Sequence, residues 1–116
     1  MKQYDWSSIP KEQMSPTFAR QVIHSHSMTV ARVYLKAGCS VPEHSHPNEQ
    51  ISMILEGSMR FHYQGKTVTL RAGDVLQIPA NLPHAADTIE DTVAMDLFSP
   101  PRQDWISGND SYLRGK

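Results

Sequence analysis

Glycines recur at a fixed interval in the middle of the chain, and this interval limits what the chain can fold into. Gly57, Gly65 and Gly73 are eight residues apart, and the intervals between them are rich in β-branched and aromatic side chains. Strands of about six residues joined by tight turns have this spacing, since glycine adopts the positive φ that such turns need. The spacing predicts an antiparallel meander of short strands and not a βαβ chain.

Short runs of the same kind continue on both sides of these glycines. Polar residues separate the runs, and Pro100-Pro101 ends the last one because proline cannot donate to a strand ladder. The predicted strands are FARQVI, MTVARVYLK, QISMILE, MRFHYQ, TVTLR, VLQIP, HAADTI and TVAMDLF. So many short strands in one small domain favour an all-β sandwich or a jelly-roll barrel.

The length of 116 residues suits one domain. We expect an irregular N-terminal arm over residues 1–16, a β-barrel over 17–102 and a C-terminal tail or short helix over 103–116.

A net charge of −1 without a basic block does not indicate a nucleic acid or a membrane as partner. No apolar run has the length of a signal-peptide core or a membrane span. The lone Cys39 excludes an internal disulfide and favours a reducing compartment, so we expect a cytoplasmic protein.

Two histidines stand close together before the QISMILE run. His44 and His46 are one residue apart, so on an extended chain both imidazoles project to the same face. Gln50 follows four residues later, and His84 comes directly after a predicted turn. In an antiparallel barrel, His84 can lie beside the strand of His44. Three imidazoles and one amide oxygen suit a divalent first-row metal: Ni, Zn, Mn, Fe or Co.

Two neighbouring residues compete as the fourth ligand. Glu49 and Gln50 point to opposite faces of a regular strand. We favour Gln50. A neutral amide leaves the metal most of its positive charge, and this favours polarisation of a bound oxygen by a Lewis acid. The alternative interpretation is that these histidines are ordinary surface or core polar groups.

The residues around both histidine groups resemble two motifs of the cupin family. The first motif is matched in order and spacing by Gly38, His44, His46, Gln50 and Gly57, and the second by Gly73, Pro79 and His84. This sequence departs from the usual motifs in three places, where Gln50, Asn81 and Thr88 stand for a glutamate, a glycine and an asparagine. The resemblance implies a double-stranded β-helix, which is a jelly-roll barrel. It also implies a metal at the barrel mouth and, commonly, a homodimer.

A second resemblance lies at the end of the last predicted strand. Asp96 and Phe98 share one face of that strand, and Arg102 follows the stiff proline pair. The run AMDLFSPPRQDW resembles the end of the small cupins of pectin and alginate degradation that act on 4,5-unsaturated monouronates. In those proteins an aspartate, a phenylalanine and an arginine at this spacing act together with the metal ligands. The resemblance implies that Asp96 and Arg102 are catalytic and that Phe98 and Arg102 bind substrate.

The reaction implied is metal-dependent ring opening and tautomerisation of the monouronate to its linear ketonised form. Arg102 is expected to bind the carboxylate, Asp96 to move a proton to carbon 4 and Phe98 to position the ring. Two other classes stay open. One is another cupin enzyme, either a dioxygenase that needs a redox metal or a sugar or polyketide isomerase. The other is a non-enzymatic module that binds a sugar acid.

The remaining candidate residues do not complete a site of their own. Arg60 shares a strand face with His62 and is a candidate substrate-binding residue at the pocket. We expect His62 to be half-buried and structural. His24 and His26 form a second pair without a third donor, and we expect them at the surface.

Overall fold

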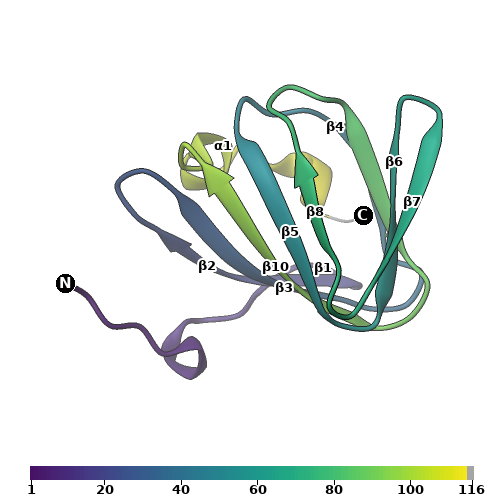
Figure 1. The fold of residues 1–116 in the computed structure, drawn as a ribbon. Coiled ribbons are helices and arrows are strands. Elements are labelled where there is room, and N and C mark those ends of the chain that lie inside the picture. The colour runs from purple at the N-terminus through teal and green to yellow at the C-terminus, as the bar shows by residue number, and fades with distance from the viewer. Residues whose placement is uncertain (115–116) are drawn as a thin grey trace.

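The computed structural model describes residues 1–114 and is built almost entirely from antiparallel strands (Figure 1). A six-stranded sheet has the order β1-β2-β3-β10-β5-β8, and a four-stranded sheet has the order β4-β9-β6-β7. The strands of the first sheet are β1 (Glu12–Ser15), β2 (Phe18–His24), β3 (Thr29–Leu35), β10 (Thr92–Ser99), β5 (Glu49–Glu56) and β8 (Val75–Ile78). Those of the second are β4 (Ser40–His44), β9 (His84–Thr88), β6 (Ser58–Tyr63) and β7 (Lys66–Arg71). The two sheets form the predicted all-β jelly roll.

The eight predicted strands are present, and β1 and β4 are additions to them. β1 is the less expected of the two. It lies inside the arm that was predicted to be irregular, where it pairs with β2 and buries Met14. Its four residues carry one apolar side chain, which is too short a pattern to indicate a strand. The arm before β1 contains a single 3₁₀ turn, η1 (Trp6–Ser8), and extends away from the barrel in Figure 1.

The meander predicted from the glycine spacing is wrong in its connections. Gly65 closes the hairpin of β6 and β7, as expected. Gly57 and Gly73 instead join strands that belong to different sheets, so each is a corner of the barrel. A corner and a hairpin both need a residue with positive φ, and spacing alone does not separate them.

Gly57 is required for a second reason. A Cβ atom at this position would lie 2.2 Å from the backbone oxygen of Asp91 and 2.9 Å from Cα of Thr92. The corner therefore packs directly against the backbone that leads into β10. At Gly65 no atom lies within 4 Å of the corresponding position.

The register of β10 decides which side chains face the interior. Asp96 pairs with Ala31 of β3 and Ser52 of β5, and Phe98 pairs with Gln50. Ala94 and Phe98 are 1% and 2% exposed, so the alternate residues of β10 that include Asp96 face inward, which the sequence pattern had left open. In the other sheet, His44 of β4 pairs with His84 of β9. The candidate site is thus formed between the two sheets.

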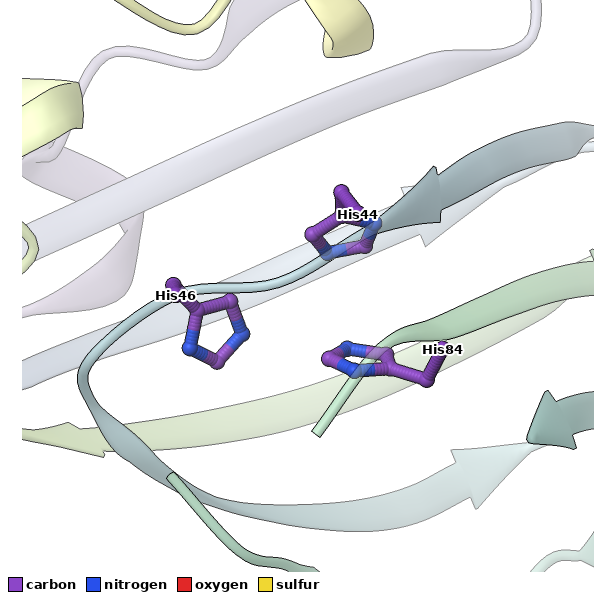
Figure 2. Close-up of side chains that lie close together, drawn as sticks. All are labelled: His44, His46 and His84. Carbon is purple, nitrogen blue, oxygen red and sulfur yellow. The ribbon is translucent and has the colours of Figure 1, made fainter. Parts of the chain in front are cut away.

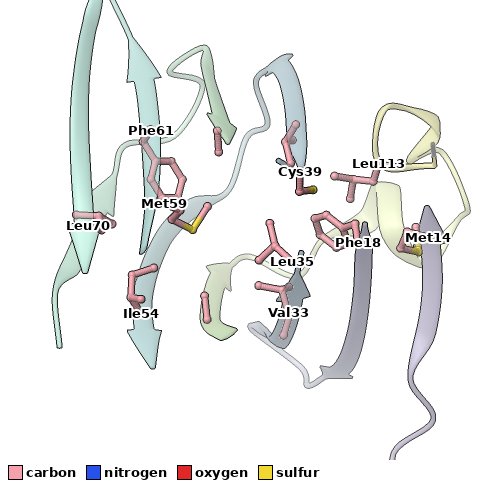
Figure 3. Packing of buried hydrophobic residues seen from close by; sticks show 14 of the residues in the cluster. Met14, Phe18, Val33, Leu35, Cys39, Ile54, Met59, Phe61, Leu70 and Leu113 are labelled. Carbon is pink, nitrogen blue, oxygen red and sulfur yellow. The ribbon is translucent and has the colours of Figure 1, made fainter. Parts of the chain in front are cut away.

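The apolar core fills the barrel next to this site (Figure 3). Ile54, Met59, Phe61 and Leu70 pack between the sheets at one end. Cys39 is 2% exposed and belongs to the same cluster, so its side chain packs in the core.

The C-terminal segment, residues 103–114, covers part of the barrel opening. It contains α1 (Gln103–Ile106) and the 3₁₀ turn η2 (Ser111–Leu113) and buries Trp105 and Leu113. An ion pair of 2.6 Å between Arg20 and Asp110 ties the segment to β2, and both side chains are at most 3% exposed. Residues 115 and 116 of the predicted tail lie outside the described residues. None of the described helices is long and apolar enough to cross a membrane.

Two alanine substitutions separate the backbone conformation of Gly57 from its close packing. We expect Gly65→Ala to lower the free energy of unfolding by about 1–2 kcal/mol, because only the positive φ is unfavourable there. Gly57→Ala should cost at least about 1 kcal/mol more, since the β10 backbone must also move. Urea unfolding of both variants measures the difference. Equal costs would contradict the packing role of Gly57.

Candidate metal centre

Two histidines from one segment, His44 and His46, and a third from a distant strand, His84, come together between the sheets (Figure 2). One ring nitrogen from each of His44, His46 and His84 lies within 4.8 Å of the others. His46 and His84 are buried, and His44 is partly buried. The structure therefore brings together the three histidines that the sequence predicted as ligands.

Each of these histidines is oriented by a backbone carbonyl two residues away. The Nδ1 atoms lie 2.9 Å from Pro42 O for His44, 3.0 Å from Asn48 O for His46 and 2.8 Å from Leu82 O for His84. A carbonyl only accepts, so each neutral ring carries its proton on Nδ1 and keeps a lone pair on Nε2. Such outer hydrogen bonds are typical of histidines that bind metals.

Burial also keeps the three rings neutral. It lowers the pKa of His44 and of His46 to about 4, and the positive charge of Arg102 contributes at His46. Burial likewise lowers the pKa of His84 below its ordinary value. At neutral pH the cluster is thus a set of uncharged donors, which is the form that binds a metal ion.

Gln50 completes the cluster, whereas Glu49 points away from it. Oε1 of Gln50 lies 3.1 Å from Nε2 of His46, and its Nε2 donates to Oγ of Ser52 at 2.9 Å. Glu49 is exposed on the opposite face and accepts from Gln77 at 2.7 Å. The structure thus places the glutamine, as predicted, beside the histidines.

The contact between His46 and Gln50 tests whether a cation fits this site. Ser52 donates its only hydroxyl proton to Oδ1 of Asp96 at 2.6 Å, so its oxygen can only accept from Gln50. This fixes the amide with its oxygen toward His46, whose Nε2 also carries a lone pair. Two acceptors that face each other at 3.1 Å in a buried site repel each other, and a shared metal ion removes that repulsion. The residues present therefore fit a metal ion.

Asp96 lies at the end of this hydrogen-bond chain and lines the cavity beside the histidines. Burial raises the pKa of Asp96 to about 6, although the hydrogen bond from Ser52 and the charge of Arg102 oppose the rise. Ser52 was not predicted as a site residue. It stands two positions after Gln50 on the inward face of β5, and this alternation was the signal that could have identified it.

Arg102 is inside the barrel and not at its rim. Its side chain is 2% exposed, and its guanidinium carbon lies 4.6 Å from the ring centre of Phe98 and 4.4 Å from that of Trp105. Nε and Nη2 donate to the two carboxylate oxygens of Asp104 at 2.9 and 2.7 Å. This carboxylate raises the pKa of Arg102 above its ordinary value, although burial opposes the rise.

These contacts limit the donors with which Arg102 can bind a substrate carboxylate. The two-donor edge of the guanidinium is already used by Asp104, and Nη2 also donates to the hydroxyl of Tyr112. Among residues 1–114, no hydrogen-bond partner is found for Nη1, so this atom is the donor left for a ligand.

Tyr112 and Trp105 line the same cavity as Asp96 and Arg102 and were not predicted as site residues. The ring of Tyr112 stacks on His44 with ring centres 4.5 Å apart. Tyr112 and Trp105 lie in the segment that was predicted only as a tail, and no motif around them indicated a site. The room left in this cavity is about 60 Å³.

Arg60 lies elsewhere, which corrects its prediction as a substrate-binding residue. It is 44% exposed on the outer face of β6 and pairs with Asp87 at 2.7 Å. His62 is on the same face, is 38% exposed and also contacts Asp87 at 2.7 Å, in line with the structural role expected for it. The second histidine pair is peripheral too, with His26 exposed and His24 bound to Thr29.

The cavity thus combines four groups of different chemistry. Neutral nitrogen and oxygen donors can hold a divalent metal, and Asp96 can take up or release a proton near neutral pH. Arg102 supplies a buried positive charge, and Phe98 supplies an apolar wall beside it. Such a set can bind a small acid and move a proton on it.

Known proteins resemble the chain in sequence and in fold. The family profile described as the cupin domain matches residues 31–99. The oxalate-binding protein of Thermotoga maritima is 35% identical over 86 residues, which are 73% of this chain and 69% of that protein. Acireductone dioxygenase 1 of Pectobacterium atrosepticum is 36% identical over 70 residues, which are 55% of this chain and 40% of that protein.

Two solved structures show how closely the fold agrees. KdgF from Halomonas sp. has a TM-score of 0.79 and 25% identity, with 85% of this chain and 94% of that chain covered. An RmlC-like cupin from Shewanella frigidimarina has a TM-score of 0.82 and 24% identity, with 88% and 93% covered. The family match extends over more than half of the sequence and carries the histidine ligands, and the chain therefore belongs to the cupin domain family.

Proposed function

We propose that the protein is a metal-dependent cupin enzyme that converts 4,5-unsaturated monouronates to their linear ketonised form. The observation that carries this proposal is the hydrogen-bond chain from Gln50 through Ser52 to Asp96. It holds an acid beside the histidine cluster, in a cavity that also contains Arg102. The likeness of AMDLFSPPRQDW to the monouronate cupins and the structural similarity to KdgF support this choice of substrate.

The metal would be held by His44, His46, His84 and Gln50. When bound, it supplies Lewis-acid polarisation of a ligand oxygen without a change of redox state. The neutral amide of Gln50, in place of a carboxylate, leaves the ion more of its charge. The proposal therefore favours a redox-inert role over oxygen chemistry.

The side chains of the cavity divide the remaining tasks. Arg102 attracts the substrate carboxylate through Nη1 and its buried charge, while Asp104 holds the other edge of the guanidinium in place. Phe98 packs beside this group and keeps the ring next to Asp96.

Asp96 transfers the proton. The anomeric hydroxyl loses a proton as the bond between C1 and the ring oxygen breaks, which leaves an aldehyde at C1 and an enolate at C5. A proton then adds to C4 and leaves a ketone at C5, next to the carboxylate. One proton is lost and one is gained, so the reaction is an isomerisation that needs no oxidant.

The small cavity and the similarity to the oxalate-binding protein of T. maritima favour a second candidate function. The second candidate is the binding of a small dicarboxylate such as oxalate at the same metal and Arg102, without turnover. A cavity volume of about 60 Å³ suits such a small anion better than a sugar ring. Turnover of the unsaturated uronate distinguishes the two candidates.

Removal of one histidine tests the metal site. We expect His84→Ala to weaken binding of nickel or zinc by at least about 100-fold, because a direct ligand matters more than the outer partners, whose loss costs 10–100-fold. His62→Ala is the matched control, since His62 faces outward. Titration calorimetry and metal analysis of both variants measure the effect. Equal metal content in the two variants would exclude His84 as a ligand.

Two aspartate variants test the proton transfer. We expect Asp96→Asn to slow the loss of the C4–C5 double-bond absorbance by at least about 100-fold, since an amide cannot shuttle the proton. Asp87→Asn, on the outer face, should change the rate by less than about twofold, because surface changes are usually small. Metal content and folding must stay equal in both variants. If metal-loaded wild-type protein does not accelerate the reaction at all, the proposed function is wrong.

A further inference from the structure

A second hollow adjoins the metal cavity on the side of β8. It offers about 320 Å³ of room and shares Phe61 and His84 with the metal cavity. Its other walls come from the ends of β6 and β8 and the loop before β9: Tyr63, Gln64, Leu76, Gln77, Ile78, Pro79 and Leu82. We call this hollow the seam groove. β8 is an edge strand of the six-stranded sheet and β7 is an edge strand of the four-stranded sheet, so within residues 1–114 no strand ladder joins the two sheets here.

The C-terminal segment closes another side of the metal cavity. Trp105, Tyr112 and Leu113 line the metal cavity but not the seam groove. The buried ion pair of Arg20 and Asp110 holds this segment in place. Breaking such a pair leaves an uncompensated buried charge, so opening on this side is strongly unfavourable. The seam groove therefore offers a ligand the less costly route to the histidines.

The volumes of the two cavities also point to the seam groove as part of the ligand site. Sites for small molecules usually measure 300–1,000 Å³. The metal cavity alone has about 60 Å³, which holds a few waters or a very small anion. For a larger acid at Asp96 and Arg102, the seam groove provides this additional volume next to His84.

The walls of the seam groove indicate which part of a ligand fits there. Apart from His84, none of its lining residues is ionisable near neutral pH. The phenol of Tyr63 and the amide of Gln64 offer neutral polar groups beside the apolar Leu76 and Leu82, whereas the amide of Gln77 is held by Glu49 on the outer face. A second carboxylate would find no cation in this lining, whereas sugar hydroxyls would find hydrogen-bond partners.

We propose that the seam groove is the second half of the ligand site and receives the uncharged, hydroxyl-bearing part of a small acid. The carboxylate of that acid lies at Arg102 in the metal cavity. This inference rests on the proposed function for the position of the carboxylate. It narrows the ligand class to monocarboxylic sugar acids, because oxalate has no uncharged part.

Neighbouring residues of β8 provide a matched pair for the test. Leu76 lines the seam groove, whereas Val75 is 61% exposed on the outer face. Leu76→Trp fills the groove, and Val75→Trp adds the same side chain outside it. The probes are galacturonate, which lacks the double bond and is not turned over, and oxalate. Titration calorimetry on the metal-loaded protein measures both affinities.

We expect Leu76→Trp to weaken galacturonate binding by at least about tenfold, an effect of about 1.4 kcal/mol, and to leave oxalate affinity within about twofold. Val75→Trp should change neither affinity. Tyr63→Ala is a second variant in case the larger side chain prevents folding. It removes a polar wall of the seam groove and should also weaken galacturonate selectively. Equal losses for both probes, no loss for either, or no galacturonate binding by the wild type would overturn the proposal.

The design separates this inference from the proposed function. If the wild type does not ketonise unsaturated uronate but galacturonate binding depends on Leu76 and Tyr63, the seam groove stands and the proposed reaction fails. If the wild type ketonises the substrate and KM is the same in Leu76→Trp and Val75→Trp, the reaction stands and the seam groove proposal fails.

Discussion

The antiparallel pairing of β10 with β5 determines which side chains reach the inside of this barrel. It sets Asp96 opposite Ser52 and Phe98 opposite Gln50. Side chains alternate between faces, so a shift of one residue would turn Asp96 outward and leave Met95 and Leu97 in the cavity. The candidate metal ligands lie on β4, on the loop after it, on β9 and at the start of β5, and the acid lies on β10. The relation between them depends on this one register.

Burial has opposite consequences for the charged groups around the site. It keeps the three histidines neutral and available as ligands, and it raises the pKa of Asp96. Arg102 stays charged in the same surroundings because Asp104 lies against it and two aromatic rings flank its guanidinium. One site thus contains neutral donors, an acid that can exchange a proton and a permanent cation. The difference between them comes from their neighbours and not from depth alone.

Sequence patterns predicted those parts of the site that local spacing encodes. His44, His46 and Gln50 follow from one short segment. Alternation places Asp96 and Phe98 on one face of β10, and the register of the folded sheet shows that this face is the inner one. The partners of Arg102 are Asp104 and Tyr112, which lie close to it in sequence but in a segment without strand or helix periodicity, so no pattern identified them. The outward position of Arg60 follows from the inward Met59 and Phe61 on β6, and that alternation could have predicted it. The glycine interval likewise identified turns but could not tell a hairpin at Gly65 from a corner at Gly57. The homodimer stays a prediction, and the chemistry of the C-terminal segment emerged only from the folded chain.

The ion pair between Arg20 and Asp110 joins residues that are 90 positions apart. The three histidines, in contrast, lie on β4, on the loop after it and on β9, which all precede the C-terminal segment. The histidines are therefore synthesised before the C-terminal segment that closes one side of the cavity. A chain still lacking its last residues would already hold its ligands in place, with the ring of His44 exposed to solvent where Tyr112 later covers it. The enclosed cavity would form only when synthesis has passed Asp110.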